Sequence, residues 1–246
     1  MNQTDKNHLN VFLNPRSVAI IGATQRQGSW GSFIIEGLRA YDYSGHIYAV
    51  NHRGNRVYGM PAFKDIREIP DKVDLAILTI PEISIEEAVR ACGEKGVKGV
   101  VIVTAGFGEA AEKGLEREKS LSELAQSFGM RLLGPNISGT FSLHDNYNGS
   151  SSPIGHMHPS PLAAACQGGF AFQDLLASGY HRGMGVGKFV HTGNECDLTV
   201  TDFLEHFGED EDVQGILMYM ETIRDGRRFM EVAREVTRKK PVVVVK

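Results

Sequence analysis

The sequence has few cysteines, and they form no recognisable pair. Only Cys92, Cys166 and Cys196 occur among 246 residues, and none belongs to a C-x-x-C motif. An odd number without such spacing argues against a disulfide framework or a zinc cage, and it suits a reducing cytoplasm. His156 and His158 form an H-x-H pair, but no third ligand lies near them in sequence, so we expect no metal site there.

Long apolar runs are also missing. No run approaches the ~20 residues that a membrane-spanning helix needs. The polar stretch Met1–Asn10 lacks the apolar core of a signal peptide. The formal net charge is −4, which does not suit a polyanionic partner. We therefore expect a cytoplasmic protein that binds neither nucleic acid nor membrane.

What the sequence does contain is an alternation of short β-branched runs with longer amphipathic stretches. Such continuous apolar runs are typical of strands buried on both faces of a parallel sheet. Their alternation with helices indicates a doubly wound α/β fold. The strands are expected at 17–21, 47–50, 75–80, 99–104 and 131–133, and the helices at 30–39, 84–95 and 112–128.

A segment rich in Ser, Gly, Asn, Pro and His, residues 145–161, interrupts this rhythm and is expected to be a linker. It separates a first domain, 1–144, from a second α/β domain, 162–246. The sequence stops directly after a strand, so we expect the second domain to be incomplete. Its strands are expected at 162–166, 188–191, 215–219 and 241–245, and its helices at 202–207 and 229–238.

The turn after the first strand, Gly22–Gly31, is the first candidate site. Its glycines allow a phosphate to approach the backbone, and the helix that follows offers N–H groups and positive potential. Gly22, Thr24 and Gly28 are its candidate ligand-binding residues. The spacing is not G-x-G-x-x-G, so a tight strand-to-helix turn without a ligand is the alternative.

The loop after the second strand bears on which nucleotide binds. An NAD site places an acid there to hold the ribose hydroxyls. Here the strand is followed by Asn51 and Arg53, with Arg56 further on and no acid. Basic groups suit an extra phosphate, such as the 3′-phosphate of coenzyme A or the 2′-phosphate of NADP. The alternative is that both arginines are solvated loop charges.

Two further strand ends are expected at the same edge, because ligands of open α/β sheets bind outside the carboxyl ends of strands. They carry Pro81 and the loop Ala105–Gly108, where glycine leaves room for a bulky cofactor arm. Asn136, in Gly134-Pro135-Asn136, follows the fifth strand and either faces a ligand or belongs to a plain turn.

Six motifs, taken in order, resemble ADP-forming acyl-CoA synthetases, which are relatives of the succinyl-CoA synthetase α subunit. The resemblance covers about residues 11–246. The motifs are Phe12–Ala23, Thr104–Glu109, Gly134–Asn136, Gly193–Asp197, Glu221–Arg227 and Val232–Val244.

The resemblance implies a Rossmann-like CoA-binding domain followed by a flavodoxin-like, succinyl-CoA ligase-type domain. It implies an acid–thiol ligase that converts acid, CoA and ATP to acyl-CoA, ADP and phosphate through an acyl phosphate and a phosphohistidine. An ATP-grasp domain or β-type subunit would bind ATP or ADP with Mg. By position, CoA would be lined by the Gly22–Gly31 turn, Asn51, Pro81, and Ala105, Gly106, Phe107 and Gly108. Glu221 matches the carboxylate that holds the active histidine.

The sequence departs from the family at two places. Where the family has S-x-S-G to cradle phosphate, this chain has Cys166 followed by Gln167, Gly168 and Gly169, which leaves backbone N–H groups as the expected phosphate ligands. Cys166 has no evident base that would make it a nucleophile. The family's phosphorylated histidine lies beyond the strand that ends this sequence, so we expect no ligase turnover from the chain alone.

Two other functions remain to be weighed. A non-catalytic CoA or acyl-CoA-binding module, or a regulatory subunit, would explain the lost hydroxyls and the absent histidine. A nicotinamide-dependent oxidoreductase would share the Rossmann turn, but it lacks the acid after the second strand. The carboxylic acid substrate is not readable from the sequence. An uncovered apolar sheet edge would favour association, including a homo-oligomer.

Overall fold

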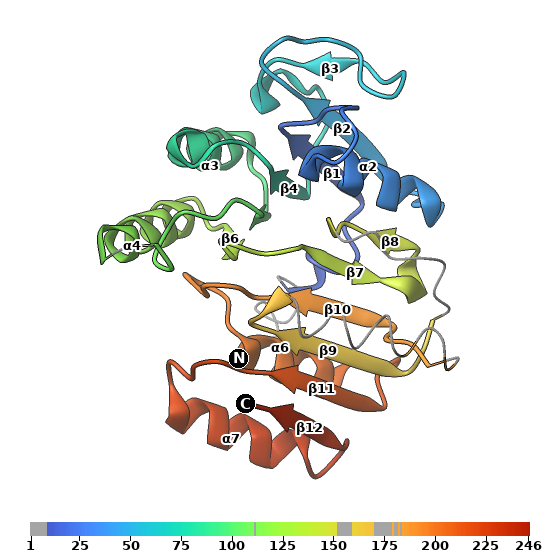
Figure 1. Cartoon of the computed structure of the whole chain (residues 1–246), viewed down its shortest axis with the longest axis vertical. Coiled ribbons are helices and arrows are strands. Elements are labelled where there is room, and N and C mark those ends of the chain that lie inside the picture. The colour runs from blue at the N-terminus through green and yellow to red at the C-terminus, as the bar shows by residue number, and fades with distance from the viewer. Residues whose placement is uncertain (1–8, 111, 152–158, 170–178, 180–181, 183) are drawn as a thin grey trace.

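The computed structural model describes residues 9–110, 112–151, 159–169, 179, 182 and 184–246. Two six-stranded sheets account for its strands, and helices flank both of them (Figure 1). His156 and His158 lie outside the described residues. Among the residues described, no helix is both long enough and apolar enough to cross a bilayer.

The first sheet is fully parallel, with the order β3-β2-β1-β4-β5-β6. This is the strand order of the Rossmann fold, and it confirms the predicted α/β architecture. Strands β1, β4 and β5 are buried on both faces, as their continuous apolar runs predict. The strands are β1 (Ser17–Ile21), β2 (His46–Val50), β3 (Ala62–Phe63), β4 (Leu75–Leu78), β5 (Gly99–Ile102) and β6 (Arg131–Leu133).

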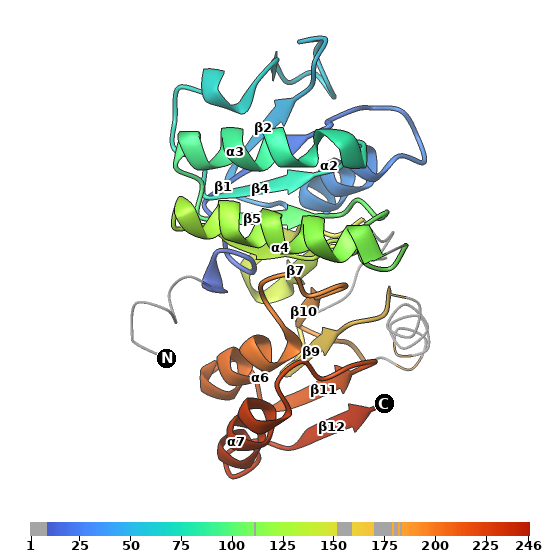
Figure 2. The ribbon, with the colours of Figure 1, turned by 90° about the vertical axis from the view of Figure 1, so that its left-hand side faces the viewer.

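Three helices cover this sheet: α2 (Trp30–Ala40), α3 (Ile85–Lys95) and α4 (Glu112–Ser127). Helix α2 lies on one face, and α3 and α4 lie side by side on the other (Figures 1 and 2). Helix α2 begins after Ser29, whose Oγ accepts a hydrogen bond from the amide N of Ser32. Helix α3 ends at Gly96 in the left-handed conformation, a common way to terminate a helix. Short 3-10 turns are η1 (Ile66–Glu68), η2 (Glu82–Ser84) and η3 (Leu143–Asp145).

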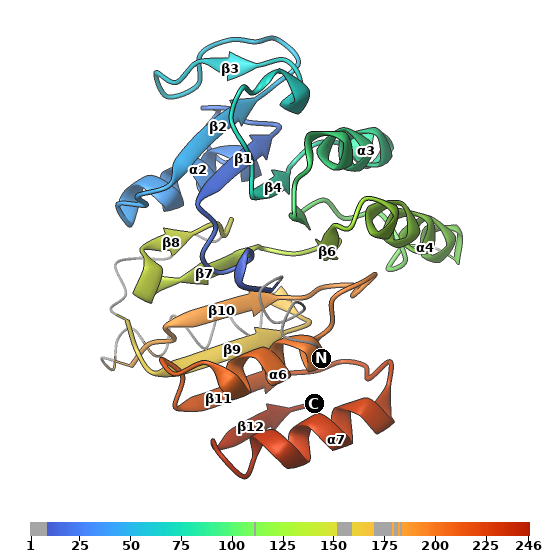
Figure 3. The ribbon, with the colours of Figure 1, turned by 180° about the vertical axis from the view of Figure 1, so that it is seen from behind.

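The second sheet is mixed, with the order β12-β11-β9-β10-β7-β8. Four strands are parallel, whereas β7 is antiparallel to β10 and β8 is antiparallel to β7. Helices α6 (Val200–Glu209) and α7 (Gly226–Val236) cover one face (Figure 3). The strands are β7 (Thr140–Ser142), β8 (Tyr147–Asn148), β9 (Leu162–Cys166), β10 (Lys188–His191), β11 (Gly215–Tyr219) and β12 (Val242–Val245).

The chain crosses from the first sheet to the second between β6 and β7. Residues 140–148 therefore pair with the second sheet, although the sequence reading placed 140–144 in the first domain and 145–148 in the linker. The boundary expected after residue 144 falls after this crossing. Two strands of three and two residues carry too short a pattern to be recognised from the sequence.

The two sheets share one hydrophobic core, which the N-terminal segment joins. Phe12 packs edge-on against Phe203 of α6, with ring centroids 6.5 Å apart. The carbonyl of Phe12 accepts a hydrogen bond from Thr140 Oγ1 at 2.7 Å. Tyr43, just after α2, packs against Tyr147 of β8 with centroids 5.8 Å apart. These contacts fix the two sheets against each other.

Strands β4, β11 and β12 point the same way in Figure 2, so the carboxyl ends of both sheets open on one side of the molecule. In the first sheet the chain runs outward in both directions from β1, and in the four parallel strands of the second sheet it does so from β9. The loops after these strands lie at topological switch points, where open α/β sheets bind ligands. The predicted sites follow β1 and β9.

Candidate functional site

The Gly22–Gly31 turn brings α2 against the first sheet. Gly22 has φ +99°, and a Cβ on it would lie 2.6 Å from Thr79 Oγ1. A Cβ on Gly31 would lie 2.6 Å from the carbonyl O of Gly22. Gly28 has φ +77°, and a Cβ there would meet nothing within 4 Å. Two glycines thus allow close packing, and the third leaves open space over the turn, which fits a phosphate group at a helix N-terminus.

Hydroxyl groups give this turn its shape without a ligand. Ser29 Oγ and Ser32 Oγ donate to the carbonyl O of Arg26 at 2.7 and 2.9 Å. Thr24 Oγ1 accepts from the amide N of Arg26 at 3.1 Å. The predicted ligand-binding Thr24 therefore also braces the turn from within.

The loop after β2 lies beside this turn. Asn51 Nδ2 donates to the carbonyl O of Ala23 at 3.5 Å and to that of Asn55 at 3.4 Å. Its Oδ1 accepts from the amide N of Arg53 at 3.1 Å. Arg53 is exposed, and within the described part of the chain its guanidinium has no recorded hydrogen bond or ion pair. Arg56 donates to the carbonyl O of Gly59. The guanidinium of Arg53 is thus available to an anionic ligand.

The loops that carry Pro81 and Ala105–Gly108 are neighbours. Thr104 Oγ1 donates to the carbonyl O of Ile80 at 2.7 Å, which ties the two strand ends together. Pro81 and Ala105 are exposed, whereas Phe107 is buried under the Arg117 guanidinium, 5.4 Å from its ring centroid. Phe107 therefore anchors the loop and leaves its neighbours at the surface.

Two carboxylates satisfy the amides of this loop. Glu109 accepts hydrogen bonds from the amide N of Gly106 and, at 3.1 Å, from that of Phe107. Glu118 accepts from the amide N of Gly108 at 2.9 Å. Burial alone would raise the pKa of Glu109, but the bonds from Gly106 and from Asn194 hold it below its usual range. The amides of Gly106, Phe107 and Gly108 are therefore satisfied within the protein and serve to shape the loop.

The structure brings Asn136 to the same place. Its amide N donates to the carbonyl O of Thr104 at 3.0 Å. Its Nδ2 donates to Oδ1 of Asn194 at 3.4 Å. Sequence reasoning included Asn194 in a family motif but assigned it no role. Its place at the end of β10, just after Gly193, was the signal that could have pointed to it.

The predicted phosphate cradle and the predicted catalytic acid also come together. Gln167 Oε1 accepts from the amide N of Glu221 at 2.6 Å and from that of Thr222 at 2.8 Å, and its Nε2 donates to the carbonyl O of Thr222 at 2.9 Å. A Cβ on Gly168 would lie 2.8 Å from Glu221 Oε1. The side chain of Gln167 thus clamps the loop of Glu221, and the carboxylate lies over Gly168.

His191 backs this cradle as a neutral, buried residue. Its Nδ1 accepts from the amide N of Ser138 at 2.8 Å, and its Nε2 donates to the carbonyl O of Gln167 at 2.8 Å. Burial lowers its pKa to about 4. A Cβ on Gly169 would lie 3.1 Å from His191 Cε1. With both ring nitrogens engaged, His191 has a structural role in this cradle.

The structure does not favour thiol or metal chemistry at this edge. Burial raises the pKa of Cys166 to about 12, which disfavours the reactive thiolate. Over the described residues, no group of three or more His, Cys, Asp and Glu side chains could hold a metal ion.

Comparison with known proteins matches each half of the chain to a domain family. A CoA binding domain matches residues 16–140, and a succinyl-CoA ligase like flavodoxin domain matches residues 159–246. The chain is 40% identical over 238 residues to the alpha subunit of acetate–CoA ligase [ADP-forming] II of Pyrococcus furiosus, covering 97% of this chain and 51% of that protein. It is also 40% identical over 242 residues to the corresponding subunit of enzyme I from the same organism, covering 97% and 52%.

A solved structure gives the same result. The dinucleotide-forming acetyl-coenzyme A synthetase 1 of Ca. Korarchaeum cryptofilum, in complex with phosphate and ADP, superposes with a TM-score of 0.91. The identity is 32%, over 97% of this chain and 51% of that one.

The fold and its strand-end loops are those of a Rossmann-type coenzyme A-binding protein with a second, flavodoxin-like domain. The chain belongs to the family of ADP-forming acyl-CoA synthetases, as a homologue of their alpha subunits. It spans about half the length of the relatives it matches.

Proposed function

We propose that this chain is the CoA-binding portion of an ADP-forming acyl-CoA synthetase, which converts a carboxylic acid, CoA and ATP to acyl-CoA, ADP and phosphate. The observation that carries the proposal is the glycine turn at Gly22–Gly31, with open space at Gly28 and a basic, acid-free loop after β2. An NAD site would need an acid in that loop.

Coenzyme A would lie across the carboxyl edge of the first sheet. The open turn at Gly28 would hold its diphosphate, and Arg53 would pair with its 3′-phosphate beside Asn51. The pantetheine arm would then run past Pro81 and the Ala105–Gly108 loop, toward Asn136. When bound, CoA supplies the thiol that attacks an activated acyl group.

Glu221 would act on a histidine supplied by a portion outside this chain, by accepting a hydrogen bond from its imidazole N–H. The carboxylate is exposed, as this role requires, while Gln167 fixes the backbone beneath it. The amide N of Gln167 donates to the carbonyl O of Tyr219 at 3.0 Å. The phosphate carried by that histidine would therefore meet the main-chain N–H groups of Gly168 and Gly169 rather than that of Gln167. An ATP-grasp domain or β-type subunit would bind ATP or ADP with Mg, and the phosphoryl group would pass between that nucleotide and the histidine.

The exposed edge of the second sheet supports a further domain or subunit. Val243, Val244 and Val245 of the edge strand β12 are 55%, 45% and 57% exposed. An apolar edge strand needs cover, whether from a β-type subunit or from a second copy. We place the reaction in the cytoplasm, since Cys92, Cys166 and Cys196 are all free.

A second candidate is a non-catalytic module that binds CoA or acyl-CoA. The position of the Glu221 carboxylate over Gly168 favours it, because a negative charge opposes phosphate where the family's hydroxyls are also missing. Supplying the C-terminal and ATP-grasp portions of a relative in trans separates the two candidates. Acid-dependent ADP formation supports the ligase, and CoA binding without it supports the module.

The primary test is calorimetric titration of the chain with CoA, 3′-dephospho-CoA and NAD in parallel. We expect CoA to bind and 3′-dephospho-CoA to bind more weakly. Arg53→Ala should remove that difference. Arg90→Ala is the matched control, because Arg90 is a half-buried arginine on α3 that pairs with Glu86. Binding of NAD without CoA would overturn the proposal.

A further inference from the structure

Asn194 lies where three strand-end loops meet. It is half-buried in the loop between β10 and α6, flanked by Gly193 and Glu195, which both have positive φ. Its amide N donates to the carbonyl O of Pro135 at 3.1 Å, and its side-chain Oδ1 accepts from Asn136. The residue is therefore held firmly by the turn after β6.

The side-chain NH₂ of Asn194 reaches the predicted CoA loop through two acids. It donates to Oε2 of Glu109 and, at 2.7 Å, to Oε1 of Glu118. These carboxylates accept hydrogen bonds from the amide N atoms of Gly106, Phe107 and Gly108. One amide group from the second sheet thus holds both of the acids that shape residues 106–108.

The opposite side of Asn194 touches the loop of Glu221. Its carbonyl O accepts a hydrogen bond from Arg224 Nη2 at 2.5 Å, and Arg224 lies three residues after Glu221. Asn194 is therefore in contact with both predicted functional loops, one from each sheet.

The charges around Asn194 make its chemistry specific. Glu118 is 4% exposed and, in the part of the chain that the structure describes, has no ion pair with a cation. Two carboxylates converge on one neutral NH₂ group, which can donate one hydrogen to each. A group of the same shape that could not donate would remove one donor from each acid and leave the two carboxylates close together with nothing between them to share.

We propose that Asn194 is a positioning residue for coenzyme A: it holds Glu109 and Glu118 so that residues 105–108 keep the shape that receives the pantetheine arm. The inference rests on the proposed function, because it takes CoA as the ligand of this loop. It adds that the second sheet determines the affinity of a site on the first.

The test compares CoA with 3′,5′-ADP, the half of the ligand that lacks the pantetheine arm. Asn194→Ala should weaken CoA binding by roughly tenfold, the usual effect of losing a hydrogen bond to a charged group. Its affinity for 3′,5′-ADP should stay unchanged, because that half lies at the Gly22–Gly31 turn and Arg53. Both affinities are measured by calorimetry on the whole chain.

Asn194→Asp separates a donor role from a space-filling one. Aspartate has nearly the same shape but adds a third carboxylate, so CoA binding should be weaker than in Asn194→Ala at neutral pH. It should recover as the pH is lowered and the introduced carboxyl takes up a proton, because protonation removes the added negative charge. A residue that only fills space would tolerate Asp better than Ala and would show no such recovery.

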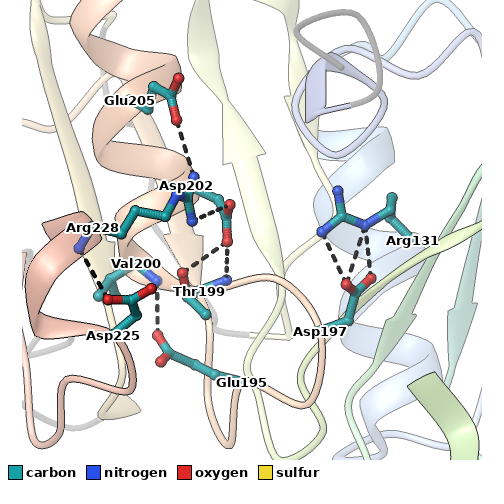
Figure 4. A network of polar contacts seen from close by, with 9 residues as sticks. All are labelled: Arg131, Glu195, Asp197, Thr199, Val200, Asp202, Glu205, Asp225 and Arg228. Carbon is teal, nitrogen blue, oxygen red and sulfur yellow. Dashed lines mark hydrogen bonds and ion pairs between the residues drawn. The ribbon is translucent and has the colours of Figure 1, made fainter. Parts of the chain in front are cut away.

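Asp197→Asn is the matched control from the same loop. Asp197 accepts hydrogen bonds from Arg131 at 2.9 Å (Figure 4). It also accepts one from the amide N of Leu132 at 2.8 Å. It joins the same two sheets without touching the CoA loop. This variant should lower the melting temperature and leave the ratio of CoA to 3′,5′-ADP affinity unchanged.

Two results overturn the inference and leave the proposed function in place. One is an unchanged CoA affinity in Asn194→Ala. The other is a fall in the ratio of CoA to 3′,5′-ADP affinity that is as large in Asp197→Asn as in Asn194→Ala. That result would mean that any damage to the contact between the two sheets weakens CoA binding. Failure of the unmodified chain to bind CoA at all would instead refute the proposed function, and the inference with it.

Discussion

The carboxylate of Glu221 lies directly against Gly168. A Cβ on the glycine would lie 2.8 Å from Glu221 Oε1 and 2.7 Å from Cε1 of Tyr219. The acid and the aromatic ring thus fill the space that a serine of the family's S-x-S-G motif would use.

This relationship predicts that Gly168→Ser destabilises the protein by about 1–3 kcal/mol, the usual cost of overpacking. Glu221→Ala in the same chain should recover part of that loss, because it removes one of the two obstructing groups. Urea unfolding of both single variants and the double variant measures the coupling. Gly226→Ser is the control, since a Cβ there meets nothing within 4 Å. Strictly additive effects would contradict the prediction.

Gly22 and Gly28 should respond differently to alanine, although both have positive φ. At Gly22 the new Cβ would lie 2.6 Å from Thr79 Oγ1 and 2.9 Å from the Thr79 carbonyl O, so the turn must shift. At Gly28 only the backbone strain of about 1–2 kcal/mol applies. We expect Gly22→Ala to lose clearly more stability than Gly28→Ala in thermal unfolding. Equal losses would mean that β1 and β4 are free to separate here.

Most of the fold could be predicted because its signals are local. The runs that form β1, β4 and β5 are apolar throughout, and they became strands buried on both faces. Observed helix ends differ from the predicted ones by one to three residues where capping residues decide them. Asp225 caps α7, so the helix starts at Gly226, three residues before the predicted Phe229. β7 and β8 were missed because their pairing depends on β10, far along the chain.

The site could be predicted only from the rule that ligands of open α/β sheets bind outside the carboxyl ends of the strands. That rule selected Gly22, Asn51 and the loop after β5, and the structure groups them at one edge. The roles of Gln167 and Asn194 were not readable, because each depends on hydrogen bonds to residues distant in sequence. Those bonds exist only once the shared core, with its Phe12–Phe203 contact, has fixed one sheet against the other.

Trp30 offers a direct signal of ligand binding. It is the only tryptophan in the sequence, and it lies 56% exposed at the first position of α2, beside the open turn. Coenzyme A bound at Gly28 would change the solvent around its indole. We therefore expect saturable quenching or enhancement of tryptophan fluorescence, with the midpoint found by calorimetry. Trp30→Phe should lose the signal and keep the calorimetric affinity, whereas calorimetric binding without any change in fluorescence would place CoA away from this turn.

His206 of α6 should make the protein sensitive to mild acid. Its Nε2 is buried without a hydrogen-bond partner among the described residues. Burial lowers its pKa to about 4, and Lys188 and Lys240 add to this effect while Asp210 opposes it. The unfolded chain takes up this proton near pH ~6.5, so between about 6.5 and 4 the unfolded state binds more protons. The stability that neutral His206 provides is therefore complete above pH ~6.5 and is lost as the pH falls toward about 4.

His206→Leu should remove this sensitivity and the unsatisfied nitrogen together. Between pH ~7.5 and ~5, its unfolding free energy should fall by about 2 kcal/mol less than that of the unmodified protein. The remaining loss belongs partly to His191, whose pKa burial also lowers to about 4. Urea unfolding at both pH values gives the comparison, with His52→Leu as the control because His52 is exposed. Equal losses in His206→Leu and the unmodified protein would show that His206 takes up its proton while folded, which an imidazole with a buried, unpartnered Nε2 should not do.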